Sequence, residues 1–199
     1  AEAITTRTAY EQLYLDKATM HVEEKRRIAR AAAELVENGD SVILDSGTTT
    51  IEIAKQLTSH TKLTIITNDL HIASTVAFHP TTQVMVTGGI KREDVNVLVG
   101  NITENFFNAI RVDKTFLSAD AVDLNFGVSN TTFVEQNVKR LMIKAAKEVI
   151  LVADHSKFGN TALAQVCALH EVDRIITDSG LSLEMREDLE RMGLPLIIV

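Results

Sequence analysis

The sequence predicts an α/β fold: an open, mainly parallel, Rossmann-like sheet covered by helices on both faces. Three observations support this prediction. Seven short apolar runs have the length of buried strands, segments with helical periodicity separate most of them, and proline occurs only twice in 199 residues. Strands that alternate with helices are typical of parallel sheets, because each crossover between parallel strands needs a connection of helix length.

The strands are predicted from runs of β-branched and aliphatic residues that are too short for helices. They lie at Ser41–Leu44, Leu63–Ile66, Val84–Val86, Thr115–Leu117, Val149–Ala153, Arg174–Ile176 and Leu196–Val199. The first helix is predicted after Glu23, where Ile28, Ala32, Leu35 and Val36 recur at helical spacing and Gly39 supplies a stop signal.

A second clear helix follows Thr132, and its apolar residues fall on one face: Val134, Val138, Leu141, Met142 and Ala145. Thr132 and Glu135 have the spacing of a capping box, in which the two side chains bond to backbone amides at the start of the helix. Residues 1–21 are polar and weakly patterned, and they are interpreted as a linker or N-terminal arm. Residues 22–199 are predicted to form one domain.

Composition places the chain among ordinary globular proteins, with 45% hydrophobic and 24% charged residues. The chain has 27 acidic and 20 basic residues, and a net charge of −7 makes it a poor candidate for binding DNA by itself. Nothing resembles a signal peptide, and the longest apolar run, Val149–Ala153, is far short of the ~20 residues that a membrane helix needs. We therefore expect a cytoplasmic protein without a membrane partner.

Neither a disulfide nor a metal site is predicted. The single cysteine, Cys167, lies among apolar residues and is expected to be a small buried hydrophobe. The six histidines, at positions 21, 60, 71, 79, 155 and 170, lack the spacing of metal ligands. The densest basic run, Lys25 to Arg30, is flanked by glutamates and is interpreted as a solvated helix face.

Polar residues follow six of the predicted strands. These turns are Asp45–Thr50, Thr67–Asp69, Thr87–Gly89, Ser118–Asp120, Asp154–Lys157 and Thr177–Gly180. The carboxyl ends of parallel strands share one edge of the sheet, where ligands bind. The six turns are therefore candidates to line one crevice.

The turn Asp45–Thr50 is the most informative of them. Its residues are Asp45, Ser46, Gly47, Thr48, Thr49 and Thr50, and a helix is predicted to begin among the threonines. Free amides and the helix dipole would bind an anion here, most naturally a phosphate. The alternative is that the hydroxyls only cap the helix. The glycine-lysine ending of a P-loop is absent, and so is the dinucleotide glycine fingerprint, so no cofactor is predicted.

Other turn residues have both a functional and a structural interpretation. Lys157 would add a point charge to the same anion, or it is a solvated loop lysine. Gly88 and Gly89 would line the crevice, or they form a mobile turn. Asp120 and Asp123 would hold sugar hydroxyls or act as acid and base, or they only form turns.

Several short motifs in a fixed order link the sequence to a known family. They are Glu24-Lys25 with Ile28-Ala29, then Asp45–Thr49, Thr67-Asn68, Thr87–Gly89, Ser118–Asp120, Gly127-Val128, Val152–Gly159 and Ile176–Asp178. Together they resemble the C-terminal effector-sensing domain of the DeoR family of bacterial transcriptional regulators, from about Arg7 to Leu194.

The resemblance implies a fold similar to ribose-5-phosphate isomerase, glucosamine-6-phosphate deaminase and the CoA-transferase-like proteins. It implies a sensor of a phosphorylated sugar or a related catabolic intermediate. By the same resemblance, residues 45–50 and Lys157 would hold the phosphate, and Asp120, Thr67, Asn68, Gly88 and Gly89 would meet the sugar. No catalytic residue and no cofactor are implied.

A sugar-phosphate isomerase-like enzyme is the alternative. Residues matching the isomerase motifs are Asp120, Asp123, Asp154, Ser156 and Lys157, and Glu135 lies where the general base would be sought. The isomerases, however, have a Lys-Gly-Gly-Gly segment ahead of that glutamate, where this chain has Asn125–Val128 without a lysine. Enediol chemistry needs a positioned base and stabilisation of an oxyanion, so the missing lysine favours binding without turnover.

Family members carry a winged helix-turn-helix domain before the sensor. Residues 1–21 are too short for such a domain, and no basic recognition helix follows them. We therefore expect contact with operator DNA only through a domain that this sequence does not include. The resemblance also implies a repressor of sugar catabolism that works as a homo-oligomer.

Overall fold

The computed structural model describes residues 8, 14–93 and 95–199. Its main sheet consists of seven strands: β1 (Ser41–Leu44), β2 (Thr64–Thr67), β3 (Gln83–Val86), β6 (Val112–Leu117), β9 (Ala146–Val152), β11 (Arg174–Thr177) and β12 (Leu196–Ile198). Their order is β12-β11-β9-β6-β1-β2-β3, and every neighbouring pair is parallel. The predicted parallel sheet is confirmed, and each strand overlaps a predicted apolar run, although β6 and β9 begin three residues earlier than predicted.

The strand order reverses beside β1. The chain runs from β1 outward to β2 and β3, and it then returns to place β6 on the opposite side of β1. Ile43 in β1 is opposite Ile66 in β2 and Thr115 in β6. Loops that follow two such strands leave the sheet toward opposite faces, so a crevice opens between them.

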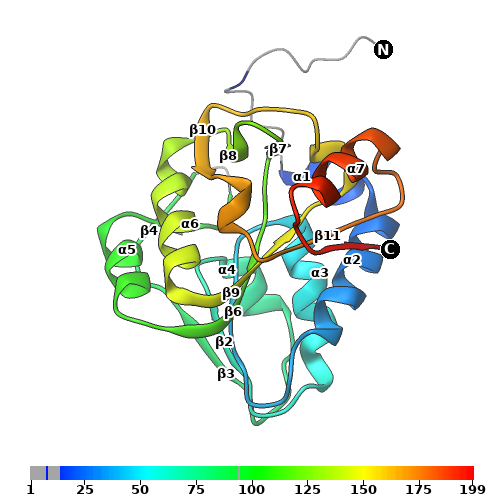
Figure 1. Cartoon of the computed structure of the whole chain (residues 1–199). Helices are drawn as coiled ribbons and strands as arrows, with labels where there is room; N and C mark the ends of the chain where they lie inside the picture. Colours follow the sequence, from blue (N-terminus) through cyan, green and yellow to red (C-terminus); the bar gives the residue numbers. More distant parts are fainter. Residues whose placement is uncertain (1–7, 9–13, 94) are drawn as a thin grey trace.

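Helices cover both faces of the sheet (Figure 1). They are α1 (Tyr14–Thr19), α2 (Val22–Glu34), α3 (Thr48–Gln56), α4 (Leu70–Thr75), α5 (Asn101–Asn108), α6 (Phe133–Ala145) and α7 (Leu183–Arg191). Three 3-10 turns complete the set, η1 (Leu57–Ser59), η2 (His155–Lys157) and η3 (Leu169–Glu171). Residues of α2, α3 and α4 pack on one face, and residues of α5, α6 and α7 pack on the other.

The core is divided by the alternation of side chains along the strands. Val42 and Leu44 pack with α2 and α3, whereas Ile43 between them packs with Phe107 of α5 and Met142 of α6. Successive residues of a strand point to opposite faces, so a strand buried on both faces must be apolar throughout. This requirement applies to the inner strands, such as β1 and β9, and is why their apolar runs could be recognised in the sequence.

Two small antiparallel sheets were not predicted. One contains β7 (Ala121–Asp123), β8 (Gly127–Asn130) and β10 (Ala164–Cys167), and the other pairs β4 (Ile90–Lys91) with β5 (Leu98–Val99). These strands have two to four residues each. A strand this short has no detectable periodicity, and β10 is far from β8 in the sequence.

The predicted capping box of α6 is wrong. Thr132 is the N-cap residue, but its hydroxyl has no hydrogen-bond partner among the described residues. Glu135 instead pairs with Arg92 and accepts a hydrogen bond from Asn130 at 3.3 Å. A charged partner from a distant loop therefore takes the glutamate away from the helix end. Val134, expected on the buried face, is 51% exposed.

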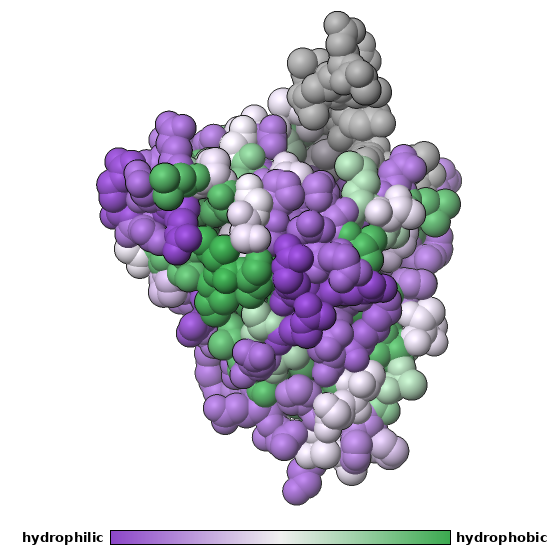
Figure 2. Space-filling model, turned by 90° about the vertical axis from the view of Figure 1, so that its right-hand side faces the viewer, coloured by the Kyte–Doolittle hydropathy of each residue, from purple (hydrophilic) through white to green (hydrophobic). Residues whose placement is uncertain are grey.

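The prediction of a solvated basic face on α2 is correct for Arg26 and Arg30, which are exposed, and wrong for Lys25, which is buried. Lys25 precedes Ile28 and Ala29 by three and four residues, so it lies on their side of the helix. The face of the molecule that includes α2 is mostly hydrophilic, with hydrophobic patches between the polar residues (Figure 2).

Two further features bear on the composition of the chain. Cys167 is buried and unpaired, as expected. None of the helices in the part of the chain that the structure describes is both long and apolar enough to cross a membrane.

Candidate functional site

A cavity of about 310 Å³ opens at the carboxyl ends of β1 and β6, where the strand order reverses. Its walls come from the loop between β1 and α3, the turns after β6 and β9, helices α1, α2 and α6, and Lys91, Glu93 and residues 95–97. Small-molecule sites have volumes of roughly 300–1,000 Å³. The cavity is therefore large enough for a small metabolite.

The loop between β1 and α3 forms one wall of the cavity with Ser46, Gly47, Thr48 and Thr49. Helix α3 begins there without a side-chain cap and without an acidic residue in its first turn. The first amides of a helix have no acceptor within it, so they can bind an anion. A Cβ atom at Gly47 would lie 3.2 Å from Ser118, so glycine allows close packing against the turn after β6.

Asp45 supports this loop from within the protein and lies outside the residues that line the cavity. Its Oδ1 accepts the Ser46 amide at 2.8 Å. Its Oδ2 accepts the Ser118 amide at 2.9 Å, the Ser118 hydroxyl at 2.7 Å and the Lys139 ammonium. Thr50 is likewise internal, since its hydroxyl donates to the Gly47 carbonyl at 3.0 Å. Both residues, predicted as ligand contacts, instead shape the loop.

Lys139 and Asp45 form a buried ion pair beneath the cavity, with side chains 3% and 1% exposed. Burial alone lowers the pKa of Lys139, but the carboxylates of Asp45 and Glu135 outweigh it and raise that pKa. The ammonium also donates to the Ser118 carbonyl at 3.1 Å. Because Ser118 follows β6 and Asp45 follows β1, this lysine joins the two sides of the crevice.

Four other predicted contacts also lie outside the cavity wall. Thr67 accepts the Asp69 amide at 3.0 Å, and the Asn68 side chain donates to the Leu98 carbonyl at 2.9 Å. Gly88 and Gly89 pack against α5, where a Cβ atom at Gly89 would lie 2.3 Å from the Thr103 hydroxyl. Thr67 and Asn68 hold loops together, and Gly88 and Gly89 are required for close packing against α5.

Asp120 lines the cavity, as predicted. Its Oδ1 pairs with Lys17 of α1 at 2.7 Å, and its Oδ2 accepts the amide and hydroxyl of Thr131 at 3.0 and 3.1 Å. Burial raises the pKa of Asp120, but Lys17 and the Thr131 amide outweigh it and hold the pKa at about 2. Asp123 lies outside the cavity wall and only caps a turn, accepting the amides of Asn125 and Phe126.

The low pKa of Asp120 predicts a pH dependence. The pKa is about 2 in the folded chain against an ordinary 3.8, so the unfolded chain binds the proton more readily. Ionised Asp120 therefore adds about 2 kcal/mol to the free energy of unfolding. This contribution is complete above pH ~4 and is lost as pH falls toward ~2. Urea unfolding at a series of pH values should show a smaller loss for Asp120→Asn than for the parent. Parallel losses in the two proteins would contradict the pKa shift.

Of the cavity-wall lysines, Lys25, Lys91 and Lys157 have no carboxylate bonded to them among the described residues, and Lys91 donates to the Arg92 carbonyl at 3.1 Å. Lys157, in η2, has no ion-pair or hydrogen-bond partner for its ammonium among the described residues. Lys25 donates to the backbone carbonyls of Lys17 and Met20. Burial lowers the pKa of Lys25, and the nearby Lys157 and Lys17 lower it further, against an opposing effect of Asp154. An anion in the cavity would relieve this repulsion.

Glu135, the residue sought as an isomerase base, also lines the cavity. Burial raises the pKa of its carboxyl, with Lys139 and Arg92 acting in the opposite direction. Arg92 pairs with one oxygen and the Asn130 amide reaches the other. The carboxylate is thus held by partners from two other segments.

Sequence reasoning identified six residues of this wall: Ser46, Gly47, Thr48, Thr49, Asp120 and Lys157. It missed Lys17, Lys25 and Lys139, which come from helices rather than strand ends. For two of them a signal was present. Lys25 and Lys139 share a helix face with apolar neighbours, and a lysine at such a position indicates a buried partner.

Comparison with known proteins decides the family. The DeoR C terminal sensor domain matches residues 20–179 of the chain. The chain belongs to the DeoR sensor-domain family. The putative aga operon transcriptional repressor of Escherichia coli O157:H7 is 35% identical over 92% of the chain and 68% of that protein. The glycerol-3-phosphate regulon repressor of Escherichia coli K12 is 33% identical over 82% of the chain and 65% of that protein.

A third relative is the HTH-type transcriptional regulator GlpR of Haloferax volcanii, which is 34% identical over 96% of the chain and 75% of that protein. The chain thus spans about two thirds to three quarters of the length of these three DeoR-family proteins. All three are named as regulators or repressors, which is a non-enzymatic role. The expectation of a regulator is confirmed at this level.

Solved structures support the fold class. The delta subunit of eIF2B from Chaetomium thermophilum superposes with a TM-score of 0.53 at 14% identity, over 79% of the chain and 56% of that protein. The beta subunit gives 0.52 at 16% identity, over 77% and 50%. A ribose 5-phosphate isomerase from Plasmodium falciparum gives 0.48 at 14% identity, over 68% and 52%. The chain therefore spans about half the length of these proteins, and the eIF2B similarity indicates the fold alone.

Proposed function

We propose that this DeoR sensor domain binds a phosphorylated sugar, or a related catabolic intermediate, in the cavity beside β1 and β6. One observation carries the proposal: the uncapped first turn of α3 and Lys157, whose ammonium has no partner among the described residues, line the same cavity. Backbone amides and a free ammonium together form a site for a phosphate. The chain's charge of −7 opposes an anion at long range, so these groups must hold it locally.

The remainder of the cavity would bind the sugar. Its wall contains Asp120, Asn130 and Glu135, whose oxygen and nitrogen atoms have the chemistry to bond to hydroxyl groups. The phosphate end is defined by fixed backbone amides, whereas the sugar end is defined by side chains that differ easily between proteins. We therefore place recognition of the phosphate at residues 46–49 and Lys157, and selection of the sugar around Asp120.

The proposed role is regulation of operator binding in a larger protein. The glycerol-3-phosphate regulon repressor is named for a phosphorylated compound, which fits an effector of this class. Helix α1 reaches the cavity through Lys17 and its ion pair with Asp120. An effector that binds one arrangement of α1 more tightly than another would shift a DNA-binding domain or a subunit interface. We expect the intact regulator to act as a homo-oligomer.

Replacing Lys157 with methionine tests the phosphate site. We expect a panel of sugar phosphates, measured by calorimetry, to include a ligand whose Kd rises about 10- to 100-fold in Lys157→Met, the loss of one charged hydrogen bond. The unphosphorylated form of the same sugar should bind both proteins equally. Lys55→Met is the control, because Lys55 lies on α3 outside the cavity and pairs with Glu52.

Equal affinity of the parent and Lys157→Met for every binding sugar phosphate would contradict the placement of the phosphate. Binding of no member of the panel would contradict the effector class. Turnover of ribose 5-phosphate that disappears in Glu135→Gln would favour the isomerase alternative over a sensor.

A further inference from the structure

We propose that His21, Asp154 and His155 form a binding site for a divalent transition metal ion, with Zn²⁺ as the representative ion. His21 immediately precedes α2, and Asp154 and His155 lie at the start of η2. The site is next to the proposed effector cavity, since Asp154 lines that cavity and the two histidines do not. The inference stands apart from the identity of any effector.

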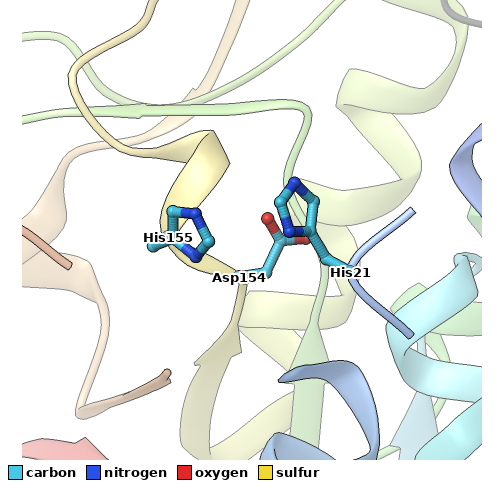
Figure 3. Close-up of side chains that lie close together, drawn as sticks. All are labelled: His21, Asp154 and His155. Carbon is cyan, nitrogen blue, oxygen red and sulfur yellow. The ribbon is translucent and has the colours of Figure 1, made fainter. Parts of the chain in front are cut away.

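The three side chains converge in space although they are far apart in the sequence (Figure 3). One potential ligand atom from each residue lies within 4.8 Å of the others. The two imidazole rings are 4.8 Å apart between centroids and meet edge to face at 81°. Ligands of a tetrahedral zinc ion at 2.0–2.2 Å are closer together than this, so small side-chain rotations would close the site around the metal.

His155 is oriented as a metal-binding histidine usually is. Its Nδ1 lies 2.6 Å from Asp178 Oδ1, and the Asp178 carboxylate also accepts the His155 amide at 2.9 Å. A carboxylate that receives the Nδ1 proton fixes the tautomer and leaves Nε2 with a free lone pair. Among the described residues, no hydrogen bond engages Nε2. This nitrogen is therefore available to a metal.

His21 has a conformation that helix formation does not explain. It has φ 51° and ψ 39°, in the left-handed region, and its side chain makes no capping bond to α2. Serine, threonine, aspartate and asparagine are the usual caps, and non-glycine residues are uncommon in this region. The conformation instead places the ring against His155. A metal bound by both rings would account for the choice of histidine.

Asp154 has one carboxylate oxygen available. Its Oδ1 accepts the amide and hydroxyl of Ser156, whereas no described residue donates to Oδ2. Two imidazoles and one carboxylate are the donor set of zinc sites that leave a fourth position open to water or a ligand. The positive charges of Lys25 and Lys157 lie near Asp154 and would repel a cation. Nitrogen ligands rather than net charge must then drive binding, which favours Zn²⁺ over Mg²⁺ and Ca²⁺.

The metal would link two parts of the cavity wall. His21 joins α1 to α2, which supply Lys17 and Lys25, and η2 supplies Lys157. A bound ion would fix the distance between these segments. This site could not be predicted from the sequence, because ligands from separate segments have no characteristic spacing along the chain.

Calorimetric titration of the chelator-treated chain with ZnCl₂ tests the site. We expect one ion per chain, binding at least 10-fold more weakly in His21→Asn and in His155→Asn. Asparagine tolerates the left-handed conformation at position 21. At position 155 its amide retains a donor to Asp178 while the distal nitrogen is lost. Asp178→Asn should weaken binding about 10- to 100-fold, as loss of a carboxylate behind a metal-bound histidine does.

The control is His170→Asn, an exposed histidine outside the cluster, which should bind Zn²⁺ like the parent. MgCl₂ should give no binding heat in any of these proteins. As a second measurement, Co²⁺ in place of Zn²⁺ should give the visible absorption of a tetrahedral site with nitrogen ligands, and this band should be absent in both histidine variants. Circular dichroism verifies that each variant is folded. Absence of Zn²⁺ binding in the parent, or binding in either histidine variant as tight as in the parent, would overturn the proposal.

Discussion

Replacing Lys139 with methionine is expected to lower the free energy of unfolding by about 3 to 5 kcal/mol, the cost of removing one partner from a buried ion pair. Methionine fills a similar volume but leaves the Asp45 carboxylate, 1% exposed, without its counter-ion. The hydroxyl and amide of Ser118 remain as donors and do not supply a charge. Urea unfolding at neutral pH measures the effect.

Lys147→Met is the matched control for this experiment. Lys147 also pairs with an aspartate, Asp113 at 2.7 Å, but its side chain is 77% exposed. Water and salt screen an exposed pair, so the same chemical change there should leave the unfolding midpoint almost unchanged. Similar effects of the two substitutions would contradict the structural role given to Lys139. Asp45→Asn combined with Lys139→Met should recover part of the lost stability, because the unpaired charge is then gone.

Replacing Gly127 with alanine is expected to cost about 3 kcal/mol or more, through overpacking together with an unfavourable backbone conformation. A Cβ atom at this position in β8 would lie 2.2 Å from the Cys167 carbonyl and 2.9 Å from the Ala168 Cα, and φ is +80°. Both neighbours are backbone atoms that cannot rotate away. Strand β10 would have to move off β8, which carries Asn130 into the cavity wall.

Gly39→Ala separates the two contributions. Gly39 has φ +95°, but nothing lies within 4 Å of a Cβ atom there. This substitution should therefore cost only the conformational part, about 1 to 2 kcal/mol. Urea unfolding of the two variants would contradict the steric argument if Gly127→Ala proved no more destabilising than Gly39→Ala.

Most of the main sheet could be predicted because its inner strands are buried on both faces, whereas the edge strands β3 and β12 are only partly buried or exposed. Ile43 packs with α5 and α6 while Val42 and Leu44 pack with α2 and α3, so these three consecutive positions of β1 are all apolar. Such a requirement is visible in a few consecutive residues. The small strands β7 and β10 lack it, since Asp123 and Gln165 remain partly exposed, and β8 is buried but has glycine, serine and asparagine beside a single valine. Their pairing depends on where the main sheet places them.

The candidate site could be predicted only in outline. Strand-end turns identified residues 46–49, Asp120 and Lys157, because parallel strands bring their carboxyl ends to one edge. The same reasoning also included Asp45, whose oxygens accept hydrogen bonds from protein donors, and Gly88 and Gly89, which pack on α5, and none of these three residues lines the cavity. A polar residue at a strand end has either a ligand or another loop as its partner. Which of these it has depends on contacts between distant segments.

The sequence by itself determined the strand and helix pattern, the edge of the sheet where a ligand would bind, and the DeoR-family motifs. These features are local, since they depend on the period of apolar residues and on a few turn residues. Only the tertiary structure decided which lysines surround the cavity, that Lys139 joins Asp45 to Ser118, and that His21 lies beside His155. The reason is physical: a charge or an imidazole acts over a few ångströms, and only the folded chain brings such groups that close.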